Sequence, residues 1–179
     1  MIIGNFFKKV KSKHKNHNFS GLCFNSSKCK KGNIFFAIKG ETENGNKFIN
    51  QAIQKGAKTI ISSQNYEGLK KNILYIKSLN VRKSLSEIAY SINKNKPKNM
   101  IAITGTNGKS SIADFYFQIL TLTKRKVASI GTLGVKKGNI IKSVSNTTLD
   151  PIKLSKVLNQ LKKENINDII LEASSHGLK

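Results

Sequence analysis

The stretch "IAITGTNGKSS", residues 101–111, decides the fold of the second half of the chain. An apolar run stands directly before two glycines, a lysine and two serines. Where a buried strand leads into a helix, the first turn of the helix has free N–H groups and partial positive charge. Gly105 and Gly108 let the backbone curl around an oxyanion, Lys109 adds a positive charge, and Ser110 offers a hydroxyl suited to Mg²⁺. The stretch therefore predicts a phosphate-binding loop.

The spacing of this loop differs from the common one. The pattern G-x-x-x-x-G-K-[ST] requires glycine at position 103, where this chain has Ile103, so the match is to a shorter variant, T-G-x-x-G-K-S. The alternative is a simple glycine turn with a solvated lysine. A helical pattern after the loop favours the phosphate loop, because Ile112, Phe115, Tyr116 and Ile119 have the spacing of one apolar stripe.

Composition limits the class of protein. A chain of 179 residues is long enough for one full domain or two small ones. It has no run of 18 apolar residues, and its first apolar stretch is too short for a signal peptide, so we expect a cytoplasmic protein without membrane association. Cys23 and Cys29 are too few for a disulfide framework, which agrees with a reducing compartment.

The charge of the chain is strongly positive, with 32 basic and 9 acidic residues and a formal net charge of +23. Such a charge favours nonspecific adsorption to nucleic acid at low salt. Arg82 and Arg125 are the only arginines, however, and reading of base edges favours arginine over lysine. We therefore expect no specific nucleic-acid partner.

A zinc site is one further possibility, formed by His14, His17, Cys23 and Cys29. The two cysteines are six residues apart, which is wider than the usual spacing of zinc ligands. Exposed histidines and a small buried cysteine are the favoured interpretation.

The first half of the chain predicts alternating strands and helices. We expect strands in the segments 32–40, 58–63 and 72–77, and helices around 49–55, ending at Gly56, and 82–93. The segment "NKNKPKN" with Pro97 then breaks the periodicity. It predicts a boundary between a domain of residues 1–96 and a domain of residues 97–179.

The second half continues this alternation. After the phosphate-loop strand and helix we expect a strand in "KVASIGTLG" (126–134) and a helix with Asp150 as N-cap and Pro151 at its first position. The apolar face of that helix is predicted from four residues, Leu154, Val157, Leu158 and Leu161. A last strand is expected in "NDIILEASSH" (167–176). This order predicts an α/β fold with a parallel sheet, and its three strands are fewer than a doubly wound nucleotide domain usually has.

Ligands of such sheets bind beyond the carboxyl ends of the strands. The phosphate loop, Asn146–Thr148 and Glu172–His176 can meet at that edge. Glu172 is suited to hold Mg²⁺, and His176 to hold a second ion or orient a phosphate. The alternative is that Glu172 caps a local structure and that His176 is a loop histidine.

Four motifs together resemble the Mur ligase family. They are "GTNGKSS", "NTT" at 146–148, "EASSHGL" at 172–178, and "GNIFFAIKGETENGNKFINQAIQKGA" at 32–57. The resemblance covers nearly the whole chain. It is strongest to the family member that adds the third amino acid to UDP-N-acetylmuramoyl-L-alanyl-D-glutamate.

The resemblance implies a fold and a set of site residues. The implied fold is a small mixed α/β domain (1–96) that binds the UDP-sugar, followed by an incomplete parallel-sheet P-loop domain (97–179) that binds ATP. The implied ATP-binding residues are Gly105, Thr106, Asn107, Gly108, Lys109, Ser110 and Ser111. The implied catalytic residues are Lys109, Glu172 and His176, and the implied magnesium ligands are Ser110, Glu172 and His176. The implied substrate contacts are Phe24, Ser26, Glu41, Thr42, Glu43, Asn146, Thr147, Thr148 and Ser174.

The activity implied is ATP-dependent amide ligation in peptidoglycan precursor synthesis, through an acyl phosphate that an incoming amine attacks. The implied cofactors are ATP and Mg²⁺, and the implied partners are a UDP-N-acetylmuramoyl dipeptide and an amino acid. The full-length protein is expected to be a monomer. The domain that selects diaminopimelate or lysine in this family is missing, so we expect these 179 residues alone not to ligate. The family's Asp-Ser-Arg stretch reads Asn25-Ser26-Ser27 here, which removes an arginine near the uridine. The alternative functions are a non-catalytic nucleotide-binding module and a nonspecific nucleic-acid binder.

Overall fold

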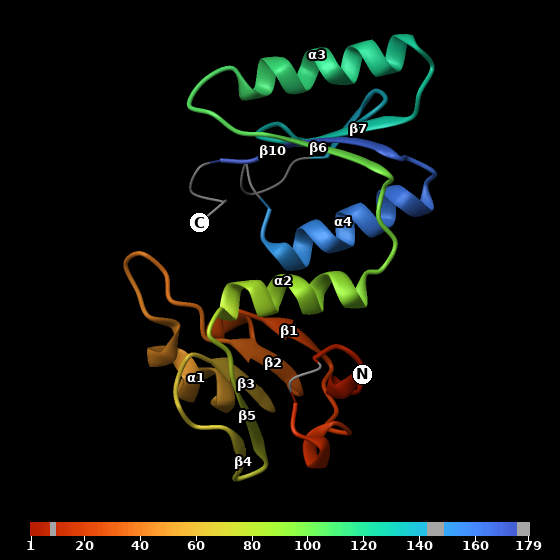
Figure 1. The fold of residues 1–179 in the computed structure, drawn as a ribbon. Helices are drawn as coiled ribbons and strands as arrows, with labels where there is room; N and C mark the ends of the chain where they lie inside the picture. Colours follow the sequence, from red (N-terminus) through yellow and green to blue (C-terminus); the bar gives the residue numbers. More distant parts are fainter. Residues whose placement is uncertain (8–9, 143–148, 175–179) are drawn as a thin grey trace. The chain divides into compact units, whose positions relative to one another are not determined.

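A computed structural model describes residues 1–7, 10–142 and 149–174 of the chain (Figure 1). The chain divides into two compact units, Met1–Ile92 (unit 1) and Asn93–Lys179 (unit 2). The boundary predicted from the sequence lay a few residues later, after residue 96. Each unit holds a five-stranded sheet with helices, so the predicted α/β class is confirmed.

The sheet of unit 1 has the strand order β1-β2-β3-β5-β4. Its strands are β1 (Gly21–Cys23), β2 (Asn33–Phe36), β3 (Thr59–Ser62), β4 (Gly68–Lys70) and β5 (Ile73–Lys77). Four of them run parallel, and β4 pairs antiparallel with β5 at one edge. The three longer strands were expected from their apolar runs. The short strands β1 and β4 were not predicted.

Two helices cover this sheet, α1 (Ile49–Gln54) and α2 (Val81–Ile92). Ile49 and Ala52 of α1 share a buried cluster with Phe35 and Ile60, whose side chains lie side by side in adjacent strands. Helix α1 ends where predicted, because Gly56 has φ +99°, a conformation that glycine adopts easily. Helix α2 packs against β2, and its buried side chains are Val81, Ser84, Leu85, Ile88 and Ala89.

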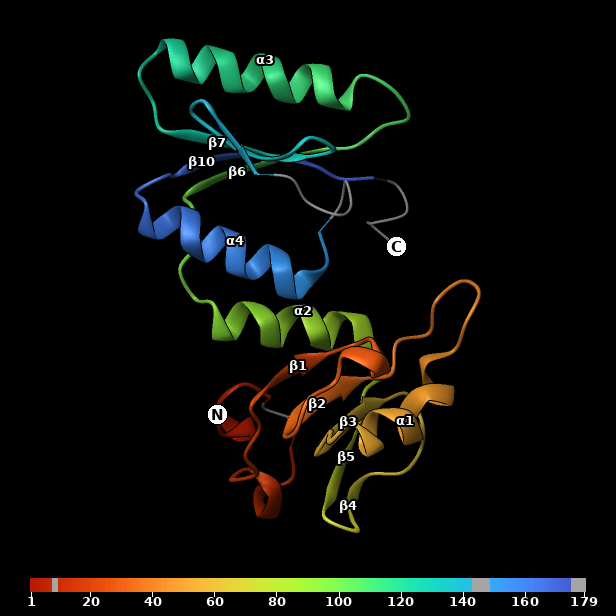
Figure 2. The same cartoon turned by 180° about the vertical axis from the view of Figure 1, so that it is seen from behind.

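The sheet of unit 2 has the strand order β6-β10-β7-β8-β9. Its strands are β6 (Asn99–Ile103), β7 (Val127–Gly131), β8 (Gly134–Lys137), β9 (Ile140–Lys142) and β10 (Asp168–Glu172). The parallel strands β6, β10 and β7 are the three that the sequence predicted. The antiparallel strands β8 and β9 were not predicted. Helix α3 (Lys109–Leu122) lies on one face of this sheet and α4 (Pro151–Lys163) on the other, as both views show (Figures 1 and 2).

Helix α4 begins as predicted. The Asp150 carboxylate accepts a hydrogen bond from the Lys153 N–H at 3.0 Å, and Pro151 occupies the first helical position. Leu158 and Leu161 are buried, and Leu154 and Val157 are partly buried at the margin of the same face. The helix therefore packs on the sheet through the predicted face.

The apolar stripe of α3 is not the face that packs on the sheet. Ile112, Phe115 and Ile119 are 53%, 63% and 59% exposed, whereas the buried side chains are Ala113 and Phe117. The phosphate loop fixes how the helix leaves β6, and the face that then meets the sheet is the one with the small Ala113. The apolar stripe that the sequence revealed is real, but it points away from the sheet.

The two cysteines also differ from expectation. Cys23 and Cys29 are joined in a disulfide with sulfur atoms 1.99 Å apart, and both are buried. Because paired sulfurs are not available as ligands, the zinc alternative fails, and the described residues contain no cluster of three or more possible metal-ligating His, Cys, Asp or Glu side chains.

Among the described residues, no helix has the length and apolar character needed to cross a membrane.

Candidate nucleotide site

The phosphate loop connects the end of β6 to the start of α3. Gly108 caps α3 in a left-handed conformation with φ +77°, which a residue with a side chain adopts only with strain. The loop residues 104–108 are exposed. Lys109 Nζ donates hydrogen bonds to the carbonyl oxygens of Gly105 at 2.7 Å and Thr106 at 3.2 Å, so its ammonium group lies over the loop. The loop therefore presents backbone N–H groups and a cation at one point, as an anion site requires.

Glu172 ends β10 beside this loop. Strand β10 pairs in parallel with β6, with Glu172 opposite Ile103, and the Ala173 N–H donates to the Ile103 carbonyl at 2.8 Å. The Glu172 side chain is buried, and its Oε2 accepts hydrogen bonds from Ser110 Oγ at 2.9 Å and Thr132 Oγ1 at 3.0 Å. The structure thus joins three elements, the start of α3, the end of β10 and the turn after β7, around one carboxylate.

Gly131 gives this carboxylate its space. A Cβ atom at Gly131 would lie 2.1 Å from Glu172 Oε1, which is far inside the contact distance. Neither Gly131 nor Thr132 was identified from the sequence as a site residue. The only signal was "GT" at the end of an apolar strand, and its meaning depends on β7 and β10 being neighbours in the sheet.

The residues present fit a magnesium ion. A serine hydroxyl and a carboxylate oxygen meet within hydrogen-bond distance, and Mg²⁺ in nucleotide sites is commonly held by one or two such groups together with phosphate oxygens. Lys109 in the same loop supplies the additional positive charge that phosphates need. The carboxylate is already oriented by the hydrogen bond from Thr132 Oγ1.

The remaining predicted site residues of unit 2 fall into two groups. Ser111 lies exposed in the first turn of α3, and Ser174 lies partly buried two residues after Glu172. Asn146, Thr147, Thr148 and His176 lie outside the described residues, so their predicted roles stay predictions.

The predicted substrate residues of unit 1 lie after two neighbouring strands. Phe24 follows β1 and is 40% exposed. Ser26 is buried, and its Oγ donates to Gln51 Oε1 at 2.5 Å, so its hydroxyl is already used inside the unit. Asn25 caps the short turn here by accepting from the Ser27 N–H at 3.0 Å.

The loop with Glu41, Thr42 and Glu43 follows β2, and all three residues are exposed. The Gly40 N–H donates to the Glu43 carbonyl at 2.8 Å, which closes the loop into a turn. Because β1 and β2 are parallel neighbours, this loop and Phe24 lie at the same edge of the sheet of unit 1. The structure therefore brings the predicted substrate residues of this unit to one edge.

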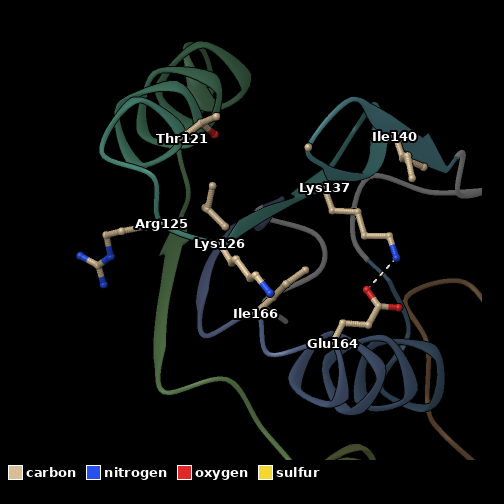
Figure 3. A pocket seen from close by; sticks show the side chains of 9 residues that line it. Thr121, Arg125, Lys126, Lys137, Ile140, Glu164 and Ile166 are labelled. Atoms are coloured by element: carbon tan, nitrogen blue, oxygen red, sulfur yellow. Dashed lines mark hydrogen bonds and ion pairs between the residues drawn. The ribbon is translucent and has the colours of Figure 1, made fainter.

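A cavity of about 350 Å³ lies at the amino ends of the parallel strands of unit 2, opposite the end that carries the phosphate loop (Figure 3). Its lining includes Thr121, Lys126, Ile140 and Ile166, which surround the start of β7. Two of its charged groups are already paired: Lys137 Nζ lies 2.6 Å from Glu164 Oε2 (Figure 3), and this hydrogen bond lowers the pKa of Glu164. The phosphate loop follows the carboxyl end of β6, so the cavity and the loop lie at opposite ends of the parallel strands.

Two family models match the chain. The model of the Mur ligase middle domain matches residues 103–179, and the model of the Mur ligase family catalytic domain matches residues 18–99. The border between them, at residues 99–103, falls in β6, a few residues after the boundary between the two units at Ile92 and Asn93.

Curated relatives agree with these models. The chain is 41% identical over 169 residues to the UDP-N-acetylmuramoyl-L-alanyl-D-glutamate–2,6-diaminopimelate ligase of Rickettsia prowazekii, with 92% of this chain and 35% of the relative covered. It is 41% identical over 168 residues to the ligase of the same name from Wigglesworthia glossinidia brevipalpis, with 89% and 34% covered. The chain thus spans about a third of the length of these relatives.

Solved structures show the same likeness. A structure of a ligase with that same name superimposes with a TM-score of 0.79 at 26% identity, covering 99% of this chain and 37% of the other. The MurF ligase from Thermotoga maritima in complex with ADP superimposes with a TM-score of 0.53 at 20% identity, covering 86% and 32%, which shows a shared fold.

Proposed function

Because this chain belongs to the Mur ligase family, we propose that it carries the ATP-binding loop and the UDP-sugar-binding domain of an ATP-dependent amide ligase of peptidoglycan precursor synthesis. The proposed substrate is UDP-N-acetylmuramoyl-L-alanyl-D-glutamate, and the proposed co-substrate is a diamino acid, as in the names of the relatives. The proposed cofactors are ATP and Mg²⁺, and the proposed location is the cytoplasm.

One observation carries this proposal: the meeting of Lys109, Ser110 and Glu172 at the carboxyl edge of the sheet of unit 2. A phosphate loop alone is compatible with many reactions. A loop whose serine hydroxyl is bonded to a buried carboxylate from a neighbouring strand is arranged for a nucleotide together with a metal ion.

In the proposed reaction, an oxygen of the D-glutamyl carboxylate attacks the γ-phosphorus of ATP, and ADP leaves. The amine of the incoming amino acid then attacks the acyl carbon of the acyl phosphate, phosphate leaves, and the amine loses a proton. Mg²⁺, when bound, neutralises phosphate charge. Lys109 and the loop N–H groups hold the phosphates in position, and such positioning provides most of the catalysis in phosphoryl transfer. No side chain of this chain has to act as a nucleophile.

Unit 1 is proposed to hold the uridine end of the substrate at the edge where β1 and β2 end. The exposed ring of Phe24 is available for stacking, and the exposed loop with Thr42 lies at the same edge. Ser26 is proposed to act through its backbone or by a shift of its hydroxyl, because that hydroxyl is donated to Gln51.

Hydrogen exchange with two ligands added separately tests this division of roles. A UDP-N-acetylmuramoyl dipeptide should slow exchange of backbone amides around Ser26 and Thr42 in unit 1. ATP with Mg²⁺ should slow exchange of the amides of residues 105–111 in unit 2. If the dipeptide protects only amides beyond Met100, the role of unit 1 is wrong. If neither ligand protects any amide, the chain does not bind the substrates of a ligase.

A further inference from the structure

Two loops that carry lysines precede the central strands of unit 1. Lys30 and Lys31 lie just before β2. Lys55 and Lys58 lie just before β3, and all four side chains are exposed. Because β2 and β3 are parallel neighbours, their amino ends lie about 4.8 Å apart at one edge of the sheet. The four lysines (the basic cluster) therefore lie at the edge opposite the proposed uridine site.

Backbone hydrogen bonds hold the two loops together. The Gly32 N–H donates to the Gly56 carbonyl at 2.7 Å, and the Lys58 N–H donates to the Asn33 carbonyl at 3.0 Å. A Cβ atom at Gly56 would lie 2.8 Å from Lys31 Cα, so a glycine is needed for the loops to come this close. The backbone positions of the basic cluster are thus fixed by the fold, and only the lysine side chains have to be ordered when a ligand binds.

The basic cluster brings four positive charges close together. The acidic residues of unit 1 lie outside both loops; they are Glu41, Glu43, Glu67 and Glu87. Within residues 1–7, 10–142 and 149–174, which the structure describes, no ion pair includes a lysine of the cluster. The four charges therefore add to one another, and they make this edge a strongly positive surface.

The imidazole of His17 senses this charge. Its ring N–H donates to the Lys58 carbonyl at 3.2 Å, so His17 lies against the loop before β3. Burial is the largest cause that lowers the pKa of His17, and this hydrogen bond acts in the opposite direction. The charges of His14 and Lys58 lower the pKa further, as expected where positive charge is not balanced.

The residue types at this edge fit phosphate groups. A lysine ammonium is a compact charge that binds phosphate, whereas reading of base edges favours arginine, which the basic cluster does not contain. Binding to an anionic membrane surface uses an amphipathic helix whose apolar face enters the lipid. The basic cluster lies instead in loops between a helix or turn and a strand. An extended polyanion in water is therefore the favoured partner.

We propose that the basic cluster binds the phosphate backbone of nucleic acid without reading its bases. Each lysine pairs with a phosphate and releases a counterion from the strand. The carboxyl edge of the sheet of unit 1 remains the proposed site of the UDP-sugar, and its amino edge binds the polyanion. This inference does not depend on the ligase function. It is compatible with the expectation that no specific nucleic-acid partner exists, because phosphates carry no sequence information.

Fluorescence anisotropy with a labelled oligothymidylate tests the proposal. The full 179-residue chain is titrated at salt concentrations from about 50 to about 200 mM, and the logarithm of its binding constant should fall linearly with the logarithm of the salt concentration. The variant Lys30→Gln/Lys31→Gln/Lys55→Gln/Lys58→Gln should bind at least about tenfold more weakly at the lowest salt concentration. Its slope should be shallower by about 2.8, the value for four lost phosphate contacts with a single strand.

A matched control variant removes four charges from exposed lysines elsewhere in unit 1. It is Lys28→Gln/Lys39→Gln/Lys47→Gln/Lys83→Gln. Its binding should weaken by no more than about threefold, because salt screens exposed charges that lie more than about 10 Å from the bound strand. Circular dichroism confirms that both variants fold.

Absence of oligothymidylate binding at the lowest salt concentration would overturn the proposal. Equal weakening in the cluster variant and the control variant would also overturn it, because binding would then follow net charge alone. Cosedimentation with vesicles that contain an anionic phospholipid is the second measurement. Vesicle binding that is lost in the cluster variant, together with unchanged oligothymidylate binding, would assign the cluster to a membrane surface instead.

Discussion

The two units differ in how completely they bury their apolar side chains. In unit 1, both faces of the central strands β2 and β3 are closed, and Ile34, Phe35, Ile60 and Ile61 are at most 1% exposed. In unit 2, the central strands β10 and β7 are buried, but β6 and the outer side of α3 expose Ile101 and Phe115. The central strands are therefore buried in both units, and the difference lies in unit 2, where the edge strand β6 and the outer side of α3 leave apolar side chains exposed. The unit with the open edge is also the one that carries the phosphate loop.

The largest effect expected from this difference is on stability. Phe35→Ala should destabilise unit 1 by about 3–5 kcal/mol, because Phe35 is 1% exposed and its loss leaves a cavity. Phe115→Ala is the matched change in unit 2, and it should alter stability by no more than about 0.5 kcal/mol. Urea unfolding followed by hydrogen exchange reports on each unit separately. Comparable losses in both variants would show that the outer side of α3 is packed after all.

A smaller effect is expected at the carboxylate of the nucleotide site. Gly131→Ala should displace Glu172, because the added methyl group would lie 2.1 Å from its Oε1. The ratio of the ATP affinity with Mg²⁺ to the ATP affinity without it should be about tenfold smaller in this variant than in the unaltered chain, a difference of about 1.4 kcal/mol. ATP affinity measured by calorimetry with Mg²⁺ and with EDTA checks this. The control is Ser129→Ala in the same strand, which should preserve the response to Mg²⁺, and an unchanged response in Gly131→Ala would remove Glu172 from the metal site.

The N-cap of α4 should contribute to the stability of unit 2 by an amount typical of helix caps. Asp150→Ala removes the hydrogen bond from the Lys153 N–H and should destabilise unit 2 by about 1 kcal/mol, while Asp150→Asn should retain most of the stability. Thermal unfolding of the two variants measures the difference. Equal melting temperatures for Asp150→Ala and the unaltered chain would mean that the cap is unimportant.

The smallest effect concerns pH and unit 1. Burial lowers the pKa of His17 below its usual value of 6.5, although its ring N–H donates a hydrogen bond to the Lys58 carbonyl, which acts in the opposite direction. The unfolded chain therefore binds the proton more readily, and stability is lost as pH falls from about 6.5 through the folded pKa. Between pH 7.5 and 5.5, the urea midpoint of the unaltered chain should fall further than that of His17→Gln. Equal falls would contradict this assignment.

Local patterns allowed much of this structure to be predicted. The phosphate loop depends on residues that are adjacent in the sequence, and so do the cap at Asp150 and the periodicity of α2. Their signals are complete within a few residues. The parallel strands of unit 2 could be predicted because each is a short apolar run between helices.

Features that depend on contacts between distant residues could not be predicted. The stripe of α3 was visible, but only the course of the loop and the pairing of Asp114 with Lys136 decide that Ala113 faces the sheet. The roles of Gly131 and Thr132 follow from β7 lying next to β10. The disulfide required knowledge that the turn after β1 brings Cys29 back to Cys23.

The central claim is that the loop at residues 105–111 binds ATP with Mg²⁺, and calorimetric titration of the purified chain tests it most directly. Lys109→Ala should weaken binding about ten- to hundredfold, because it removes a charge-assisted contact of roughly 1.5–3 kcal/mol. Lys126→Ala, which removes the same charge at the opposite edge of the sheet, should bind like the unaltered chain. Equal affinity of Lys109→Ala and the unaltered chain for ATP would contradict the claim.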